Sequence, residues 1–312
     1  MSQAAKIIIT EFMDAPAVAA LAAEFETFHD ATLVDRTAEL YATLQDADAV
    51  IVRNRTQVNA ALLAAGPKLR VVGRLGVGLD NIDMAACKAR GVEVIPAFGA
   101  NALAVAEYVI GTAMLLLRGG YQSTAAVAAG KWPRAALSNG REISGKTLGI
   151  VGFGSIGQLT AQLARGMGMS VIASDPMIAN DAPIWAQTGV ACRSIEALLA
   201  ESDVVTLHVP LVDDTKNLIN TARLTMMKHD AILINTARGG IVDEAAVAAA
   251  LRANKLGGAA LDVFDIEPLQ AGTVLVDCPN LLLTPHLAGV TAEANTRVGT
   301  MIAERVAKFL RG

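Results

Sequence analysis

One glycine-rich turn constrains the fold of this chain more than any other feature. The apolar run Leu148–Val151 leads into Gly152-Phe-Gly154-Ser-Ile-Gly157, and a helical pattern continues to about Met167. Strand, GxGxxG and helix in that order predict a parallel α/β unit, because the glycines allow a tight turn, close approach of a pyrophosphate and close packing of helix on strand. The phosphates would lie on the first amides of the helix, at the positive end of its dipole.

A carboxylate after the next predicted strand supports this interpretation. The run Val171–Ser174 ends at Asp175, which lies 18 residues beyond Gly157. A carboxylate at that position can accept hydrogen bonds from both hydroxyls of a ribose. The three residues that follow, Pro-Met-Ile, bring no cation for a 2′-phosphate, so NAD is favoured over NADP. The alternative is a turn that only packs the helix, with Asp175 a solvated loop residue.

Short apolar runs alternate with helical stretches along the chain, which predicts an α/β protein built from two doubly wound parallel-sheet domains. A length of 312 residues also fits two domains better than one. The strand candidates of the first series are Lys6–Thr10, Ala49–Arg53, Val71–Arg74 and Val92–Pro96. Those of the second are Leu148–Val151, Val171–Ser174, Val204–Val209, Ala231–Asn235, Ala259–Val263 and Leu281–Thr284.

The junction between the two series contains an apolar helix and a segment rich in turn signals. The helix is expected over Ala104–Leu117, and Gly119–Lys146 holds Gly-Gly, Trp-Pro and Asn-Gly pairs. A last amphipathic segment, Glu293–Leu310, either closes the second domain or returns to the first.

Charge and cysteine content exclude several classes of partner. A formal net charge of −4 gives no general attraction to nucleic acid or to an anionic membrane. The apolar helix carries Glu107 and falls short of the roughly 20 residues that cross a bilayer. Cys87, Cys192 and Cys278 are odd in number, widely separated and without a CxxC pattern, so they indicate neither a disulfide framework nor a zinc site. With no secretory segment at its start, the chain is expected to be cytoplasmic, with buried thiols and no metal.

Three segments of the second series place an arginine, a glutamate and a histidine after apolar strands. Arg238 follows the fourth strand candidate, Glu267 the fifth and His286 the sixth. Because open parallel sheets bind ligands at the carboxyl ends of their strands, we expect these side chains to converge on one site.

These three residue types suit the reduction of a 2-keto acid. A guanidinium such as that of Arg238 can fix the carboxylate and polarise the carbonyl. The oxygen that becomes an alkoxide needs a proton from a group that titrates near neutrality, which points to His286. Glu267 would fix the tautomer of the imidazole and favour its protonated form.

Plainer interpretations exist for each residue taken alone. His286 could be an ordinary histidine after a proline, an interpretation that its association with the arginine and the glutamate makes unattractive. Asp262 could accept a hydrogen bond from the nicotinamide carboxamide or could be a loop aspartate without a role. The remaining histidines, His29, His208 and His229, have no comparable setting.

Taken together, the motifs resemble those of the D-2-hydroxyacid dehydrogenase family, which includes phosphoglycerate, glycerate, lactate and formate dehydrogenases. The resemblance covers nearly the whole chain. The motifs that carry it are Gly73-Arg74-Leu-Gly76-Val77-Gly78-Leu-Asp80-Asn81-Ile-Asp83, Asn101 with Ala106-Glu107, the GxGxxG turn, His208-Val-Pro-Leu, Asn235-Thr-Ala-Arg238-Gly-Gly, Asp262-Val-Phe, Glu267-Pro268 and Thr284-Pro-His286.

The resemblance implies the domain plan and the assembly. A Rossmann NAD-binding domain over residues 99–287 would be inserted into a flavodoxin-like substrate domain made of 1–98 and 288–312, with the active site in the cleft between them. Family members are commonly dimers joined through the NAD-binding domain, and the segment Gly119–Lys146 would be the connecting arm. The chain is expected to be a short phosphoglycerate dehydrogenase-like form, without a regulatory domain and without serine feedback through one.

The resemblance also implies roles for individual residues, with Arg238, Glu267 and His286 as the catalytic triad. Cofactor contacts are expected from Gly152, Gly154, Ser155, Ile156, Gly157, Asp175, His208, Val209, Pro210, Thr215, Thr236, Ala237, Arg238, Asp262, His286 and Gly289. Substrate contacts are expected from Leu75, Gly76, Val77, Gly78, Asn101, Arg238 and His286. In one departure, Ala288-Gly289 stands where the family often has Gly-Ala, which puts the contact to the cofactor amide in doubt.

Two arginines suggest the substrate. Arg53 and Arg55 close a strand candidate of the first domain, where the family positions groups that touch the far end of the substrate. We therefore expect a second anionic group, as in 3-phosphoglycerate or sulfolactate. The alternatives are solvated surface arginines with a monoanionic substrate such as glycerate, glyoxylate or lactate, a non-catalytic NAD-sensing co-regulator, or a formate-type enzyme without proton transfer.

Overall fold

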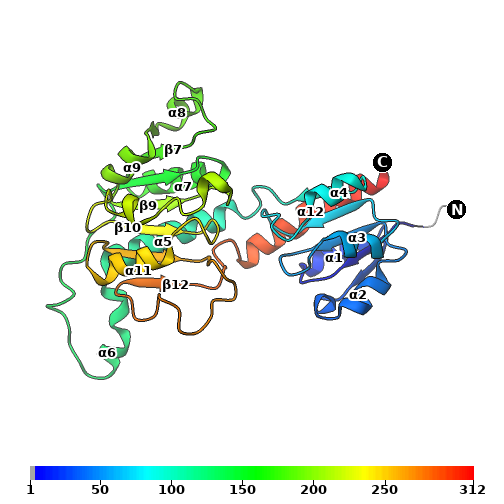
Figure 1. Ribbon diagram of the computed structural model, residues 1–312, viewed down its shortest axis with the longest axis horizontal. Helices are drawn as coiled ribbons and strands as arrows, with labels where there is room; N and C mark the ends of the chain where they lie inside the picture. The colour runs from blue at the N-terminus through cyan, green and yellow to red at the C-terminus, as the bar shows by residue number, and fades with distance from the viewer. Residues whose placement is uncertain (1–3) are drawn as a thin grey trace. The chain divides into compact units, whose positions relative to one another are not determined.

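The computed structural model describes residues 4–312, apart from the side chain of Gln122. It divides into two compact units, one comprising the chain up to Asn101 together with Val290–Gly312, the other comprising Ala102–Gly289 (Figure 1). The chain therefore leaves the first unit once and returns to it once, a few residues beyond the boundaries proposed from the sequence.

The first unit contains a five-stranded parallel sheet of order β2-β1-β3-β4-β5, which is the flavodoxin-like order 2-1-3-4-5. Its strands are β1 (Lys6–Ile9), β2 (Glu26–His29), β3 (Ala49–Val52), β4 (Val71–Arg74) and β5 (Glu93–Pro96). Its helices before the crossover are α1 (Ala15–Ala22), η1 (Leu33–Asp35), α2 (Thr37–Thr43), α3 (Ala60–Ala65) and α4 (Met84–Ala89). Strand β2 was absent from the prediction because this edge strand is largely exposed and lacks an apolar run.

The last helix, α12 (Ala292–Arg311), belongs to this first unit. Its apolar side, including Ile302 and Val306, shares one core with Ile7 and Ile9 of β1. Gly73 of β4 makes room for it, since a Cβ there would lie 2.9 Å from methyl groups of both Ile302 and Val306. The question that the sequence left open is therefore answered in favour of the first unit.

The second unit contains a seven-stranded parallel sheet of order β12-β11-β10-β9-β6-β7-β8, the Rossmann order extended by one strand. Its strands are β6 (Thr147–Val151), β7 (Ser170–Ser174), β8 (Ala191–Cys192), β9 (Val204–Leu207), β10 (Ile232–Asn235), β11 (Gly258–Leu261) and β12 (Leu281–Leu283). Its helices are α5 (Ala102–Arg118), η2 (Gly120–Ser123), α6 (Thr124–Ala128), α7 (Ser155–Gly166), α8 (Pro183–Thr188), α9 (Ile195–Glu201), η3 (Asp213–Thr215), α10 (Thr221–Leu224) and α11 (Glu244–Arg252).

Apolar strands explain why this sheet is buried on both faces. Strands β9, β10 and β11 are buried along their whole length, as expected for the interior of a parallel sheet. One apolar cluster includes α5 and α7, and a second on the other face includes α9 and α11. The predicted fold class, two doubly wound parallel sheets, is confirmed; only the two-residue strand β8 was missed in this unit. Within residues 4–312 no helix is both long enough and apolar enough to pass through a membrane.

Candidate active site

The glycine-rich turn joins β6 to α7 and is fixed by two close approaches of backbone. Gly152 has φ 91°, and a Cβ on it would overlap the carbonyl oxygen of His208. A Cβ on Gly157 would overlap the carbonyl oxygen of Gly152. At Gly154, by contrast, a Cβ would meet nothing within 4 Å. The turn therefore leaves open space next to the first amides of α7, which suits an approaching pyrophosphate.

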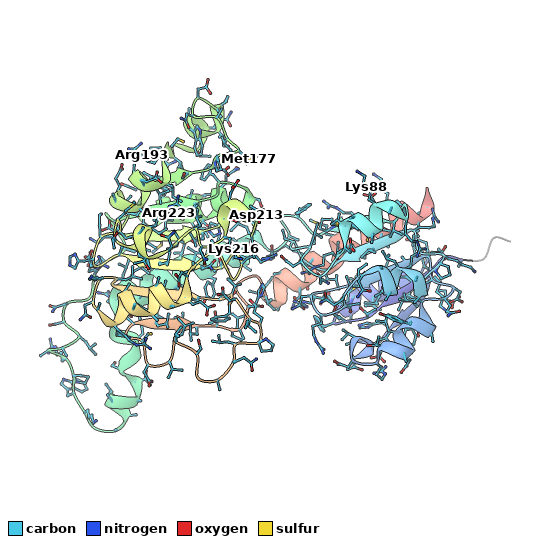
Figure 2. All side chains as sticks on the ribbon, viewed as in Figure 1. Lys88, Met177, Arg193, Asp213, Lys216 and Arg223 are labelled. Atoms are coloured by element: carbon cyan, nitrogen blue, oxygen red, sulfur yellow. The ribbon has the colours of Figure 1, made fainter. Side chains whose placement is uncertain are left out.

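Asp175 follows β7 and lies against this turn. Its Oδ2 accepts a hydrogen bond from the Phe153 amide at 2.8 Å, and its Oδ1 accepts one from the Met177 amide at 2.9 Å. Each carboxylate oxygen retains a second lone pair for a ribose hydroxyl. The Met177 side chain, labelled in Figure 2, is 90% exposed. Turn and carboxylate together have the arrangement that a dinucleotide requires.

Two further residues expected at the cofactor differ in what they offer. The Thr236 hydroxyl oxygen is buried and has no hydrogen-bond partner among the described residues. The Thr215 hydroxyl is engaged within its own loop, since it donates to the Pro210 carbonyl at 2.6 Å and accepts from the Val212 amide at 2.8 Å. Thr215 therefore shapes the loop that follows β9.

His208 begins the same loop, and its imidazole is neutral. The Nε2 atom lies 3.1 Å from the Thr206 hydroxyl, and burial lowers the pKa of His208 to about 3. Because desolvation disfavours the charged form, this histidine is uncharged near neutral pH. The position of its carbonyl, against Gly152, places the His208 backbone beside the glycine turn.

The structure brings Glu267 and His286 into direct contact. His286 Nδ1 lies 2.8 Å from Glu267 Oε2, and Glu267 Oε1 accepts a hydrogen bond from the Phe264 amide at 3.1 Å. Both side chains remain accessible, with 42% of His286 and 37% of Glu267 exposed. With Nδ1 on the carboxylate, Nε2 has no hydrogen-bond partner within residues 4–312 and is available to exchange a proton with a ligand.

The loop that carries Arg238 lies against the loop that carries Glu267. Gly239 has no room for a Cβ because the Phe264 carbonyl occupies that space. The Gly240 amide donates to Asp265 Oδ1 at 2.6 Å. Since the two loops follow the neighbouring strands β10 and β11, the sheet itself brings them together.

Asn235, the last residue of β10, shapes the Arg238 loop from inside. Its Oδ1 accepts from the Ala237 amide at 3.0 Å and its Nδ2 donates to the Arg238 carbonyl at 2.9 Å. The buried Asn235 side chain thus fixes the backbone on both sides of the turn, which limits where the guanidinium can go.

Asp262, at the end of β11, is 1% exposed, and its carboxylate is bonded to the segment that carries His286. His286 itself has φ 54°, in the left-handed region that residues with a Cβ seldom adopt. Its amide donates to the Asp262 carbonyl at 2.8 Å. The carboxamide contact expected of Asp262 stays a prediction; what the structure adds is its role in holding this loop. The main-chain torsion of His286 is the local strain associated with functional sites.

In the first unit, Glu11 organises the loop that bears the two arginines. Its buried carboxylate accepts from the amides of Arg53 at 2.9 Å, Arg55 at 3.1 Å and Thr56 at 3.0 Å. Because both oxygens of Glu11 are used by the backbone, the carboxylate fixes the loop without forming an ion pair with either guanidinium.

The two arginines differ sharply. Arg55 is exposed and its guanidinium pairs with both carboxylate oxygens of Asp35, which raises the pKa of Arg55. Arg53 is half-buried; its Nη2 donates to Asn295 Oδ1 at 3.0 Å, and its guanidinium lies over the Phe12 ring at 5.7 Å. Burial lowers the pKa of Arg53. A small cavity borders it, lined by Phe12, Met13, Asp14, Arg53, Leu75, Asn295, Val298 and Gly299.

The turn Leu75–Gly78, from which substrate contacts are expected, is stabilised by the Arg74 side chain. The buried guanidinium donates to the carbonyls of Leu75 and Gly78, each at 2.8 Å. The amides of Leu75 and Gly76 are bonded to other carbonyls. Among the amides of Leu75–Gly78, only those of Val77 and Gly78 lack a hydrogen-bond partner in the described part of the chain. Asn101, at the end of this unit, has a buried Oδ1 that is likewise unbonded there.

Sequence reasoning assigned no role to Glu11, Arg74, Asn235 or Asp265. A usable signal existed for the first three, since each is a polar residue at or just after the end of an apolar strand. Their function is to bond backbone groups of the adjacent loop, which depends on contacts across the fold. Within residues 4–312 no group of three His, Cys, Asp or Glu side chains is placed to hold a metal ion.

Comparison with known proteins gives consistent results. A family model described as "D-isomer specific 2-hydroxyacid dehydrogenase, NAD binding domain" matches residues 110–288. The chain is 50% identical over 304 residues to an (S)-sulfolactate dehydrogenase of Chromohalobacter salexigens, with 97% of this chain and 98% of the relative covered. It is 39% identical over 274 residues to a D-3-phosphoglycerate dehydrogenase of Archaeoglobus fulgidus. That alignment covers 88% of this chain and 51% of the relative, which is longer.

The fold also resembles that of solved structures. A glyoxylate reductase from Paecilomyes thermophila superposes with a TM-score of 0.86 at 28% identity, with 99% of this chain and 96% of that chain covered. The resemblance therefore extends over both compact units.

Proposed function

This chain belongs to the D-isomer specific 2-hydroxyacid dehydrogenase family and is an oxidoreductase that acts on the CH–OH group of a 2-hydroxy acid, and from that premise we propose its cofactor, catalytic residues and substrate. The cofactor is NAD, the catalytic residues are Arg238, Glu267 and His286, and the substrate carries a second anionic group. The observation that carries the catalytic assignment is the 2.8 Å contact between His286 Nδ1 and Glu267 Oε2.

The reaction needs one hydride and one proton. The glycine turn and Asp175 would hold the dinucleotide, whose nicotinamide would provide or take up the hydride exchanged with C2 of the substrate. Arg238 binds the substrate carboxylate and polarises the adjacent carbonyl. His286 holds Nδ1–H on Glu267, so that Nε2 delivers a proton to the carbonyl oxygen in reduction and removes it in oxidation. Glu267 accepts the hydrogen bond from Nδ1 and thereby fixes the tautomer and the orientation of the imidazole.

The preference for NAD rests on Asp175 and its neighbours. The carboxylate suits two ribose hydroxyls, whereas a 2′-phosphate at the same position would meet a like charge. The three residues after Asp175 offer no cation, and the exposed Met177 is one of them. Arg193, labelled in Figure 2, is already paired with both carboxylate oxygens of Glu201.

Oxidation of NADH with a panel of 2-keto acids, repeated with NADPH, tests the function and the cofactor together. Turnover with NADH should exceed that with NADPH by about 100-fold in kcat/KM, as a like-charge contact of a few kcal/mol implies. Asp175→Asn keeps an oxygen for the Phe153 amide but removes the charge, and should reduce the preference about tenfold. Asp181→Asn, an exposed aspartate nearby in sequence, serves as the control. Equal use of NADPH by the wild type would contradict the cofactor proposal; absence of turnover with every keto acid would contradict the function.

Arg53 is the proposed ligand of the second anionic group. It is half-buried and contacts the neutral amide oxygen of Asn295 and the Phe12 ring rather than forming an ion pair, so its charge is available to an anion. The relative of 50% identity acts on sulfolactate, whose sulfonate would meet this requirement, as would the phosphate of 3-phosphoglycerate. The (S) label of that relative's substrate is consistent with D-type geometry, because the sulfonate-bearing carbon outranks the carboxyl carbon in the naming rule and inverts the letter.

A homodimer joined through the NAD-binding unit is proposed from the segment around α6. None of the residues of α6 is buried, and Tyr121, Val127 and Trp132 are 61%, 43% and 78% exposed. Figure 1 shows this segment extending away from the sheet of its own unit. Exposed aromatic residues gathered on one extended segment are typical of a surface that another chain covers.

Analytical ultracentrifugation should find a species of twice the chain mass. Trp132→Ser should weaken the self-association by about 30-fold or more, the effect of losing an aromatic hot spot of about 2 kcal/mol. Met177→Ser, which removes an equally exposed apolar side chain elsewhere on the unit, should leave it unchanged. A monomeric wild type at micromolar concentration would exclude the dimer.

A further inference from the structure

The Asp262 carboxylate is a buried acceptor whose bonds all go to one short segment. Its Oδ1 accepts from the Thr284 hydroxyl at 2.6 Å and from the Leu287 amide at 2.9 Å, and its Oδ2 accepts from the Ala288 amide at 2.8 Å. The segment that these bonds enclose contains His286, whose own amide donates to the Asp262 carbonyl at 2.8 Å. The aspartate therefore holds the acid–base histidine from both sides along the chain.

A second hydroxyl extends this arrangement to helix α5. The Tyr108 hydroxyl lies 2.6 Å from the Thr284 hydroxyl oxygen. Thr284 has a single hydroxyl proton, and the Asp262 carboxylate can only accept it. The proton of the Tyr108–Thr284 contact must therefore come from Tyr108. Burial raises the pKa of Tyr108, so the phenol keeps that proton near neutral pH.

The hydrogen bonds to Asp262 stabilise an unusual backbone conformation at His286. His286 has φ 54°, and a residue with a Cβ keeps such a torsion only where its surroundings fix it. Helix α5 packs against α7 and against β10 and β11, so it is a rigid support for the chain of hydroxyls. Through Thr284 and Asp262, that support reaches the loop that presents the imidazole to Glu267.

We propose that Tyr108 and Thr284 are positioning residues, which orient the Asp262 carboxylate and through it hold His286 in the conformation that transfers the proton. The proposal rests on the proposed function, in which His286 is the proton donor. Neither side chain touches the reacting atoms; both act through hydrogen bonds in one direction, from Tyr108 to Thr284 to Asp262.

Four variants test this series of hydrogen bonds, measured as the rate of keto-acid reduction with NADH. Thr284→Val should lower kcat by about 10- to 100-fold, because it removes a hydrogen bond to a charged group, and Tyr108→Phe by about 3- to 10-fold. Thr284→Ser, which retains the hydroxyl, should remain within about threefold of wild type. The double variant Tyr108→Phe/Thr284→Val should be no slower than Thr284→Val alone, since Tyr108 acts through Thr284. Tyr41→Phe, at a half-buried tyrosine of the other unit, is the matched control.

Two further measurements separate positioning from a general loss of structure. The Kd for NADH, from fluorescence titration, should change less than about twofold in every variant. In the free protein, hydrogen exchange at the Leu287 and Ala288 amides should be faster in Tyr108→Phe than in wild type, because these amides donate to Asp262.

The outcomes are distinguishable. Three results would overturn the positioning proposal. The first is a kcat of Tyr108→Phe and Thr284→Val equal to that of an active wild type, and the second is a kcat of Thr284→Ser as low as that of Thr284→Val. The third is a loss of affinity for NADH in place of a loss of kcat. Absence of turnover in the wild type would instead contradict the proposed function. The exchange measurement needs no activity and still decides whether the three side chains hold the loop.

Discussion

Replacing His286 with alanine is expected to lower keto-acid reduction by about 10²- to 10⁴-fold while NADH affinity stays within about twofold of wild type. The imidazole is the proposed proton donor, and its Nε2 is unbonded within the described residues. Losing it removes the proton donor but none of the contacts expected for the dinucleotide at the glycine turn. Steady-state NADH oxidation and a fluorescence titration of NADH measure the two effects separately.

A histidine outside the site provides the control for this change. His229 is exposed and has no part in the loops that follow β10, β11 and β12, so His229→Ala should retain wild-type kcat. Retention of more than about a tenth of wild-type turnover in His286→Ala would contradict its role as general acid, given the usual size of such contributions. A large loss of NADH affinity would instead assign His286 to cofactor binding.

Arg53→Ala is expected to reduce the preference for a dianionic over a monoanionic keto acid by about 10- to 100-fold, the value of a hydrogen bond between charged groups. The sequence offered Arg53 and Arg55 as equals, but the structure separates them. Arg55 is already paired with Asp35, so Arg55→Ala should change the preference by less than about threefold, as for an exposed ion pair. The measurement is the ratio of kcat/KM for sulfopyruvate or phosphohydroxypyruvate to that for pyruvate.

A more discriminating variant leaves Arg53 in place. Asn295→Asp presents a carboxylate to the same guanidinium and should lower the dianion preference, because the new ion pair competes with the substrate for one cation. Asn295→Gln keeps the amide and is the matched control. If Arg53→Ala and Asn295→Asp both leave the ratio unchanged, the second anionic group is bound elsewhere or the physiological substrate lacks one.

The contact between Glu267 and His286 was predictable from the sequence because of how parallel sheets are built, whereas a catalytic triad that includes Arg238 stays a proposal. Arg238, Glu267 and His286 each follow an apolar strand, and the carboxyl ends of neighbouring parallel strands share one edge. That rule and the strand order were enough to predict the contact between Glu267 and His286. The glycine turn was predictable because its backbone geometry requires glycine: close backbone contacts at Gly152 and Gly157 leave no room for a Cβ.

What supports these groups was not predictable. Tyr108 lies in the apolar helix expected over Ala104–Leu117 and was assigned no role, and Asp262 had the pattern of a ligand contact. Their bonds to Thr284 and to the loop around His286 join segments far apart in the chain, so no local pattern announces them. The same applies to Glu11 and Arg74, whose side chains bond loop backbone that only tertiary structure brings within reach.

Because translation proceeds from the N-terminus, the placement of α12 fixes an order of events during synthesis. Strands β1 to β5 leave the ribosome first, but the apolar surface around Ile7, Ile9 and Gly73 remains uncovered until the last 20-residue helix has been made. The inserted unit is continuous in sequence and can complete its own core in the interval. The unit whose translation begins first is thus the last to become complete, and a stalled nascent chain would expose a sheet without its C-terminal helix.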